Sequence, residues 1–373
     1  MKTVVFACSV AALVAAGTVG AFGTVSTPIG KLDRAVRQLV SMRGGPPGVT
    51  AVIQRGTRRV VLRRGVADRS SGRRIALGDR WRIASVSKVF SGAAALKLVA
   101  RGRLGLDDTI ADRLPQLPDA WGRVTLRQAL QHTSGLPDYS ASAGFRAQVM
   151  AHPRQSVEPS KLLSWVAGAD LRFTPGSKYR YSNTDNIVVA FFVQAVTGLS
   201  YERALREVVL DPLGLRRTTM PAGYRMPAPY VHGYDGRRDV SEDLSPTLAW
   251  ASGGLVSTPV DLTRFIRSYG GGRLFGGATR AAQLRFRPGE SEPPGPGVNG
   301  AGLAIFRYKT SCGTVYGHTG NFLGYTAFIA TSADGRRSVT IQVSTQLAPG
   351  SGDKRAYQAL RRAFALGVCA AFS

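Results

Sequence analysis

The chain has 373 residues, 44% of them hydrophobic, and a mean hydropathy of −0.04, values typical of a globular protein with one large core or two modest ones. Lysine and arginine outnumber aspartate and glutamate by 49 to 23, which makes the formal net charge +26. The arginines stand singly or in pairs such as Arg58-Arg59 and Arg63-Arg64, without a long basic run or interleaved aromatic side chains. The composition argues against a nucleic-acid partner and is compatible with proximity to an anionic cell envelope.

The N-terminus has the pattern of a secretory signal peptide. A short basic start, Met1-Lys2-Thr3, precedes a segment of small and apolar residues that runs to about Gly23, and Ala21-Phe22-Gly23 places small residues where a signal peptidase cleaves. We expect residues 1–23 to be a cleaved signal peptide and the protein to be secreted or associated with the cell envelope. An uncleaved membrane anchor is the alternative, because about 20 apolar residues can span a bilayer.

Removal of the signal peptide would leave two cysteines, Cys312 and Cys369. In an exported chain, an even pair favours a disulfide over two free thiols. We expect this bond to tie the C-terminal helix to the sheet, and the chain-entropy relation for so long a loop gives roughly 4 kcal/mol of stabilisation.

The hydrophobic pattern changes its period along the chain. Apolar residues at a 3.6-residue spacing predict a helix over 31–42, and β-rich segments at 49–54 and 59–64 predict a hairpin. A short strand at 80–84 leads into a helix that contains Ser85. Helical periodicity then continues to about residue 280, with predicted helices at 124–131, 161–167, 186–197, 201–209 and 260–268.

Strands return near the C-terminus, at 302–308, 314–317, 325–331 and 338–345, before a last helix near Asp353. The N-terminal hairpin would be unstable alone, so strands from both chain ends must share a sheet. We therefore expect an α/β (α+β) fold in a single catalytic domain over 24–373. Its antiparallel sheet would come from about 31–84 and 301–373, flanked by helices, with a large, mainly helical insertion over 85–300.

The first chemical pattern is Ser85-Val86-Ser87-Lys88, which opens an otherwise apolar helix. Residues three apart lie on one helix face, so the Ser85 hydroxyl and the Lys88 amine can interact. Desolvation lowers the basicity of a lysine and lets it act as a base beside a hydroxyl nucleophile. Alone, the pattern also fits a helix-capping serine and a surface lysine. Ser87 is excluded as the nucleophile, because only Ser85 has a lysine three residues later.

Two further segments carry side chains suited to the same chemistry. Tyr181-Ser182-Asn183 precedes an apolar helix, where a tyrosine hydroxyl can relay a proton and an asparagine amide can hold a carbonyl group, although a helix cap is an alternative. Gly317-His318-Thr319-Gly320-Asn321 ends a predicted strand, and its glycines let a ligand approach the backbone. His132 is expected to be structural.

We expect no metal and no cofactor. The four histidines are separated in sequence and the two remaining cysteines are expected to be bonded, so no ligand cluster is predicted. The spacing Gly295-x-Gly297-x-x-Gly300 matches a dinucleotide fingerprint, but it precedes a strand instead of opening a helix. The chain also lacks the Gly-x-Ser-x-Gly elbow of many Ser-His-Asp hydrolases.

Taken in this order, Ser85-x-x-Lys88, Tyr181-x-Asn183 and His318-Thr319-Gly320 resemble the motifs of the serine penicillin-recognising hydrolases. That family includes D-alanyl-D-alanine carboxypeptidases, class C β-lactamases and their esterase relatives. The chain is most similar to secreted actinobacterial carboxypeptidases with a His-Thr-Gly motif, over nearly its whole mature length. The three motifs are jointly specific, and the resemblance implies the β-lactamase/transpeptidase-like fold.

The resemblance also implies catalytic roles. Ser85 would attack the substrate carbonyl and form an acyl-enzyme, and Lys88 would accept the proton of the serine hydroxyl. Tyr181 would pass a proton toward the leaving amine and then activate water for deacylation. The backbone N–H groups of Ser85 and Asn321 would form the oxyanion hole, where each donor contributes about 3–4 kcal/mol in the transition state.

Substrate-binding roles follow in the same way. Asn183 would bind the substrate's side-chain amide, and His318 and Thr319 would line the strand along which the substrate lies. Trp250 resembles the aromatic wall of the family's pocket, although a core tryptophan fits its sequence context equally well.

The substrate depends on an arginine that grips the terminal carboxylate in the carboxypeptidases. Arg307 is the candidate here, but a strand register shifted by one residue would put Phe306 in that place and favour an uncharged ester. The first hypothesis is an exported D-alanyl-D-alanine carboxypeptidase of peptidoglycan stem peptides, acylated by β-lactams and monomeric. An esterase or β-lactamase on the same scaffold is the alternative, and a catalytically silent envelope-binding protein is disfavoured because all motif residues are present.

Overall fold

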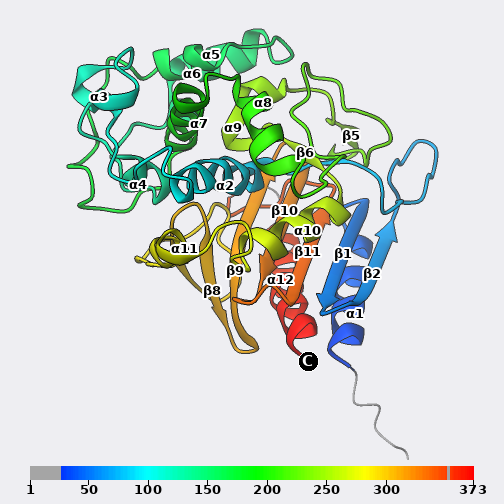
Figure 1. Cartoon of the computed structure of the whole chain (residues 1–373). Helices are drawn as coiled ribbons and strands as arrows, with labels where there is room; N and C mark the ends of the chain where they lie inside the picture. Colours follow the sequence, from blue (N-terminus) through cyan, green and yellow to red (C-terminus); the bar gives the residue numbers. More distant parts are fainter. Residues whose placement is uncertain (1–26, 351–352) are drawn as a thin grey trace, which may run out of the picture.

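The computed structural model describes residues 27–350 and 353–373, so the signal peptide predicted over 1–23 lies outside the described residues. The centre of the fold is a seven-stranded sheet with the strand order β2-β1-β11-β10-β9-β8-β7 and antiparallel neighbours throughout (Figure 1). Its strands are β1 (Gly48–Arg55), β2 (Arg58–Gly65), β7 (Val298–Ala301), β8 (Phe306–Thr310), β9 (Gly313–Phe322), β10 (Tyr325–Thr331) and β11 (Arg337–Val343). Strand β1 pairs with β11, so both chain ends share one sheet and the predicted fold class is confirmed.

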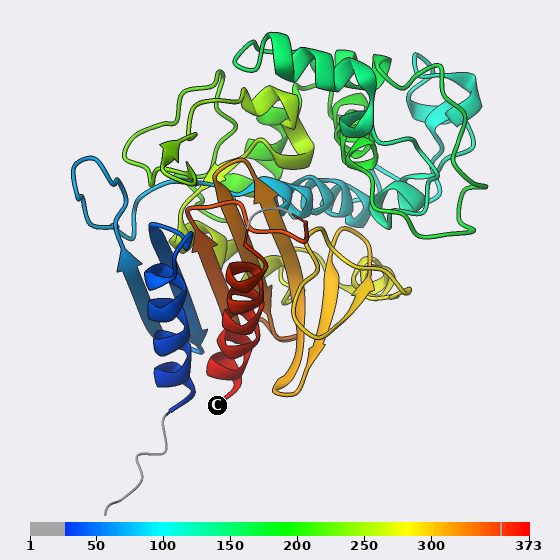
Figure 2. The ribbon, with the colours of Figure 1, turned by 180° about the vertical axis from the view of Figure 1, so that it is seen from behind.

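The two terminal helices cover one face of this sheet. Helices α1 (Pro28–Ser41) and α12 (Lys354–Phe372) lie side by side there (Figure 2), and each turns an apolar stripe inward. Cys369 on α12 is disulfide-bonded to Cys312 in the β8–β9 turn, with Cα atoms 5.0 Å apart. The bond therefore joins the last helix to the sheet, as the sequence predicts.

Helix α10 (Pro259–Tyr269) packs on the opposite face, against β10 and β11. Its Thr263 hydroxyl lies 3.1 Å from the hydroxyl of Thr340 on β11. The remaining helices are α2 (Ser87–Ala100), α3 (Ile110–Arg113), α4 (Leu126–Leu130), α5 (Ala143–Ala151), α6 (Pro159–Ser164), α7 (Asn183–Thr197), α8 (Tyr201–Leu205), α9 (Trp250–Gly253) and α11 (Gly277–Gln283). Two small sheets pair β3 (Trp81–Arg82) with β6 (Val256–Ser257) and β4 (Tyr234–Asp235) with β5 (Arg238–Asp239). Within the described ranges, no helix is both long and apolar enough to cross a membrane.

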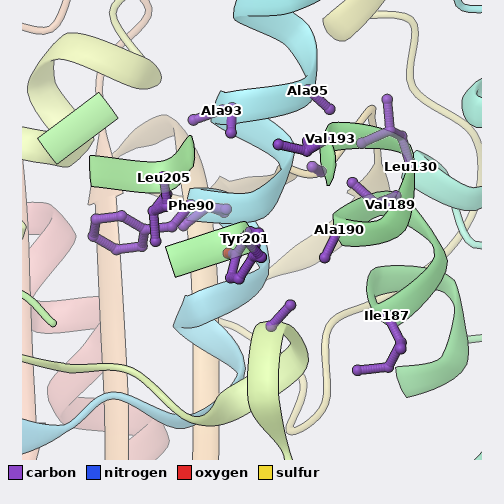
Figure 3. Packing of buried hydrophobic residues seen from close by; sticks show 14 of the residues in the cluster. Phe90, Ala93, Ala95, Leu130, Ile187, Val189, Ala190, Val193, Tyr201 and Leu205 are labelled. Atoms are coloured by element: carbon purple, nitrogen blue, oxygen red, sulfur yellow. The ribbon is translucent and has the colours of Figure 1, made fainter. Parts of the chain in front are cut away.

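Helices α2 and α7 form the centre of the helical part of the molecule. Every residue of α2 from Ser87 to Leu96 is buried, which matches a helix that is apolar on all sides. Figure 3 shows Phe90 and Ala93 of α2 packed among side chains of α7 and α8, including Val189 and Val193. This packing holds the start of α2 and the start of α7 in a fixed relation.

The sequence pattern missed part of the sheet. Strand β7 is not among the strands predicted from the sequence, and it pairs with β8, where Gly300 is opposite Arg307. Strand β9 continues to Phe322, so His318 and Thr319 lie inside a strand and not after one. Glycine-rich segments have low intrinsic strand propensity, and here the strand conformation depends on pairing with neighbours.

Candidate active site

Ser85 lies in a single 3₁₀ turn, Ala84–Val86, between β3 and α2, and not in the helix itself as predicted, because α2 begins only at Ser87. Ala84 has a φ of +51°, a left-handed conformation that is costly for a residue with a side chain. The turn is held by a hydrogen bond from Ile83 N to Leu255 O of 3.1 Å. Ser85 borders a cavity of about 880 Å³. A strained turn that presents a hydroxyl to a cavity is consistent with a nucleophile.

The side chain of Lys88 is 1% exposed and reaches back to this turn. Its Nζ lies 3.1 Å from Ser85 Oγ, 2.7 Å from Asn183 Oδ1 and 2.8 Å from the backbone oxygen of Ser252. Burial lowers the pKa of Lys88 to about 7, against the opposing effect of nearby carboxylates. When the amine is neutral, two N–H groups can satisfy Asn183 and Ser252. The lone pair is then available to accept the proton of Ser85.

Tyr181 is 8% exposed and also borders the cavity. Lys88 Nζ lies 5.0 Å from the centre of its ring. Burial raises the pKa of Tyr181 well above its usual range, and the nearby Ser85 hydroxyl opposes this effect. The phenol is therefore protonated at neutral pH and can act as a proton donor. Among the described residues, its buried hydroxyl has no partner with ordinary hydrogen-bond geometry.

The imidazole ring of His132 packs against the ring of Tyr181, with ring centres 4.5 Å apart. Its Nδ1 lies 2.8 Å from Oδ2 of Asp185, the third residue of α7. Burial lowers the pKa of His132 to about 3, so the imidazole is neutral near pH 7. The residue predicted to be structural thus positions the tyrosine, and it does so from a loop that follows α4.

Strand β9 passes directly against the nucleophile turn. A Cβ on Gly320 would lie 2.4 Å from Ile83 O, so only glycine permits this approach. The next residue, Asn321, borders the cavity together with Ser85. The structure therefore brings together the two residues whose backbone N–H groups are predicted to form the oxyanion hole.

His318 and Thr319 are buried beside the cavity and do not line it. Thr319 Oγ1 donates to Pro293 O at 2.5 Å, which fixes the loop before β7 against β9. Burial lowers the pKa of His318 to about 3, so this side chain carries no positive charge near neutral pH. Its Nε2 has no hydrogen-bond partner among the described residues.

Besides His318 and Thr319, two further predicted substrate contacts, Trp250 and Arg307, do not line the cavity. The Trp250 ring packs against Phe191 and Tyr201, and its Nε1 donates to Glu202 Oε1 at 2.6 Å, so the core alternative holds. The guanidinium of Arg307 lies 4.8 Å from the ring centre of Phe286 and away from the cavity.

Phe306 takes the inward position on β8, with its ring centre 5.0 Å from that of His318. The alternation of side chains along a strand then turns Arg307 to the other face, which corrects the expectation that Arg307 contacts the substrate.

The charge distribution of the cavity was missed by sequence analysis. Glu290 and Glu292 are among the residues that line it, whereas no lysine or arginine is among the described lining residues. Its apolar wall consists of Phe145, Val149, Leu244, Leu248, Phe322 and Leu323. The two glutamates belong to the Pro/Gly-rich segment before β7 and are part of no catalytic motif. The one signal in the sequence is that two acidic residues stand close together in a chain rich in arginine.

The chain is similar to known proteins in both sequence and fold. The model of the family described as "Beta-lactamase" matches residues 32–364. The chain is 28% identical over 320 residues to a D-aminopeptidase of Cereibacter sphaeroides, covering 83% of this chain and 59% of that protein. It is 30% identical over 207 residues to a putative D-alanyl-D-alanine carboxypeptidase of Escherichia coli, covering 51% and 46%. The chain thus spans about half the length of these curated relatives.

Solved structures share the whole fold. A D-stereospecific amidohydrolase from a Streptomyces species superposes with a TM-score of 0.75 at 30% identity, covering 88% of this chain and 96% of that one. A D-amino acid amidase from Ochrobactrum anthropi, complexed with D-phenylalanine, superposes with a TM-score of 0.76, covering 90% and 98%. At 22% identity, the second likeness concerns the fold alone.

Proposed function

The chain belongs to the beta-lactamase family of serine hydrolases, and we propose that it cleaves amides of D-amino acids that carry a free ammonium group. The observation that carries the proposal is the charge of the cavity. Glu290 and Glu292 line the same cavity as Ser85, and no basic side chain among the described lining residues is available to a carboxylate.

The reaction would proceed through an acyl-enzyme. Neutral Lys88 takes the proton of Ser85 Oγ while Oγ bonds to the substrate's carbonyl carbon, and the backbone N–H groups of Ser85 and Asn321 stabilise the oxyanion. The C–N bond then breaks, and the leaving amine receives a proton from Tyr181, which is resupplied by Lys88. Water hydrolyses the ester by the reverse set of transfers.

An ammonium group next to the scissile amide would meet a complementary environment. Glu292 has no hydrogen bond or ion pair with a described side chain, and its desolvation by the surrounding loop raises its pKa. A substrate cation beside Glu292 would favour the ionised carboxyl group and supply the ion pair that it lacks. Arg180 is near enough to lower the pKa of Glu292 but does not line the cavity.

The D-alanyl-D-alanine carboxypeptidase predicted from sequence is the second candidate. The relative in Escherichia coli with that name and the signal-like segment 1–23 support an exported enzyme of peptidoglycan stem peptides. Such a substrate would bring a carboxylate into the cavity lined by Glu290 and Glu292, which costs electrostatic free energy unless a cation compensates it. β-Lactams would be acylating ligands in either case, and esterase or β-lactamase activity is a weaker form of the same chemistry.

A parallel assay separates these functions. We would measure kcat/KM for D-phenylalanine amide, its N-acetyl derivative, a D-Ala-D-Ala peptide, a p-nitrophenyl ester and a chromogenic cephalosporin, with Ser85→Ala as background. The free D-amino acid amide should react fastest, and N-acetylation should reduce kcat/KM by about tenfold or more, as expected for loss of a charged contact. Faster turnover of the D-Ala-D-Ala peptide would refute the ammonium preference.

The proposed ammonium contact is tested by Glu292→Gln, with Glu207→Gln on a distant surface as the matched control. The first substitution should raise KM for the free amide and leave the N-acetyl derivative unchanged, whereas the control should alter neither. Equal effects of Glu292→Gln on both substrates would show that Glu292 does not bind the ammonium group.

A further inference from the structure

Asp138 lies in the loop that follows α4, at the N-terminal end of the 3₁₀ turn Tyr139–Ala141. Its Oδ2 accepts from Asn183 N at 3.0 Å and from Asn183 Nδ2 at 3.1 Å. Its Oδ1 accepts from the backbone N and the hydroxyl of Ser140 at 2.9 and 2.8 Å. Asp138 is the acceptor in all four contacts.

These contacts determine which way the Asn183 amide points. Its Nδ2 faces Asp138 and also Ser140 Oγ at 3.0 Å, so its Oδ1 is directed to Lys88. The Ser140 hydroxyl donates to Asp138 and is therefore an acceptor toward Asn183. A rotated amide would set its oxygen against the carboxylate and its NH₂ group against the lysine amine. The free-energy cost of both contacts favours the observed orientation.

The orientation of the Asn183 amide determines whether the lone pair of Lys88 is available to Ser85. With Asn183 Oδ1 and Ser252 O as acceptors, the two N–H groups of neutral Lys88 are occupied and the lone pair is left for the serine. If the Asn183 NH₂ group faced Lys88 instead, it would compete with Ser85 for that lone pair. Lys88 would then be neutral, but its lone pair would not point to the Ser85 hydroxyl.

We infer that Asp138 is a positioning residue of the catalytic centre, which holds the Asn183 amide so that Lys88 directs its lone pair to Ser85. The inference rests on the proposed acyl-enzyme chemistry. Asp138 does not line the cavity, and it acts through Asn183 and not on the substrate.

Asp138 also contributes to the electrostatics around Lys88. The ionisable groups that face Lys88 from the surrounding elements are Asp138, Asp185, Glu292, His132, His318 and Tyr181. Both histidines are neutral near pH 7 because burial lowers their pKa to about 3. Among the carboxylates, Asp138 has the largest effect in raising the pKa of Lys88 against burial. Removal of this charge should make Lys88 neutral at lower pH.

The test compares Asp138→Asn with Ser140→Ala, each in the wild-type chain and in Asn183→Ala. Asp138→Asn should lower the plateau of kcat/KM by about 10- to 100-fold, the effect of losing a hydrogen bond to a charged group. Its acid limb should move to lower pH by about 0.5 unit or more, because the neighbouring negative charge is gone. Ser140→Ala should leave the limb in place and cost less than about fivefold.

The double variant identifies the route of the effect. Because Asp138 acts through Asn183, Asp138→Asn should cost less than about threefold in the Asn183→Ala background. An equal loss in both backgrounds, or a wild-type plateau in Asp138→Asn, would overturn the inference. If Asp138→Asn does not fold, Asp138→Glu provides the second test: it keeps the charge and should keep the acid limb while the plateau falls. An active Ser85→Ala variant would instead refute the proposed function itself.

Discussion

The Nζ atom of Lys88 lies 2.7 Å from Oδ1 of Asn183, although 95 positions separate the two residues in the chain. Lys88 is the second residue of α2 and Asn183 is the first residue of α7. The two helices pack against each other through their apolar residues (Figure 3), so the hydrophobic core sets the distance between a base and the amide that orients it. Disturbance of that core should therefore affect catalysis as well as stability.

Replacement of the nucleophile should abolish acylation. Within the described ranges, Ser85→Ala removes the only hydroxyl that is hydrogen-bonded to Lys88 Nζ, and kcat/KM should fall by at least about 10⁴-fold, as for other serine nucleophiles. The matched control is Ser87→Ala, which removes a buried acceptor of Leu255 N. It should lower the free energy of unfolding by about 1–3 kcal/mol and preserve the rate. Covalent labelling by a β-lactam, followed by intact mass, measures acylation, and labelling of Ser85→Ala at the same site would contradict the assignment.

The rate should rise with pH through about 7. Lys88 must be neutral to accept a proton, and burial lowers its pKa to about 7, so the active fraction grows as pH increases past this value. We expect kcat/KM to show an acid limb near pH 7 and Lys88→Met to be inactive. Lys97→Met, a half-buried lysine later in the same helix, is the control and should keep the limb. A limb below about pH 5 would indicate a carboxylate base instead.

Gly320→Ala should reduce activity more than stability. The added Cβ would lie 2.4 Å from Ile83 O, which pushes β9 away from the nucleophile turn and displaces Asn321 N from the oxyanion hole. We expect a fall of about 10²–10³-fold in kcat, the effect of losing one donor. Gly236→Ala serves as the control, because its Cβ would meet nothing within 4 Å, although its positive φ costs some stability. Unchanged kcat in Gly320→Ala would contradict the assigned oxyanion hole.

The disulfide should stabilise the fold without affecting the chemistry. Cys312 and Cys369 are 57 positions apart, for which the chain-entropy relation gives roughly 4 kcal/mol. The double substitution to serine should lower the free energy of unfolding in urea by about 2–5 kcal/mol and change kcat/KM by less than about twofold. Alkylation of both cysteines in the native protein without reductant would show that the bond is not formed.

Arg307→Ala should leave substrate affinity unchanged. Its guanidinium contacts the Phe286 ring outside the cavity, so KM for a carboxylate-terminated peptide should change by less than about twofold and stability by about 0.5–1 kcal/mol. Lys309→Ala, an exposed residue on the same strand, is the control for general effects on β8. A KM at least tenfold higher for that peptide alone would reinstate Arg307 as a carboxylate contact.

The sequence by itself determined the features that depend on short spacings and local periodicity. The spacing Ser85-x-x-Lys88 predicts that the two side chains meet, and in the structure Lys88 Nζ, at the start of α2, lies 3.1 Å from Ser85 Oγ in the preceding 3₁₀ turn. Alternation and helical periodicity were also sufficient to predict a sheet shared by both chain ends, which β1 and β11 form. Such features can be predicted from the sequence because they depend on residues that are close together in the chain.

Only the tertiary structure decided the features that depend on register and on contacts between distant segments. The register of β8 against β9 turned Phe306 inward and Arg307 outward, a choice that one residue of slip would reverse. Packing put Trp250 in the core and brought Asp138 to the amide of Asn183, 45 positions away. No local pattern encodes these relations, because a carboxylate in a loop acquires its partner only when separate elements pack together.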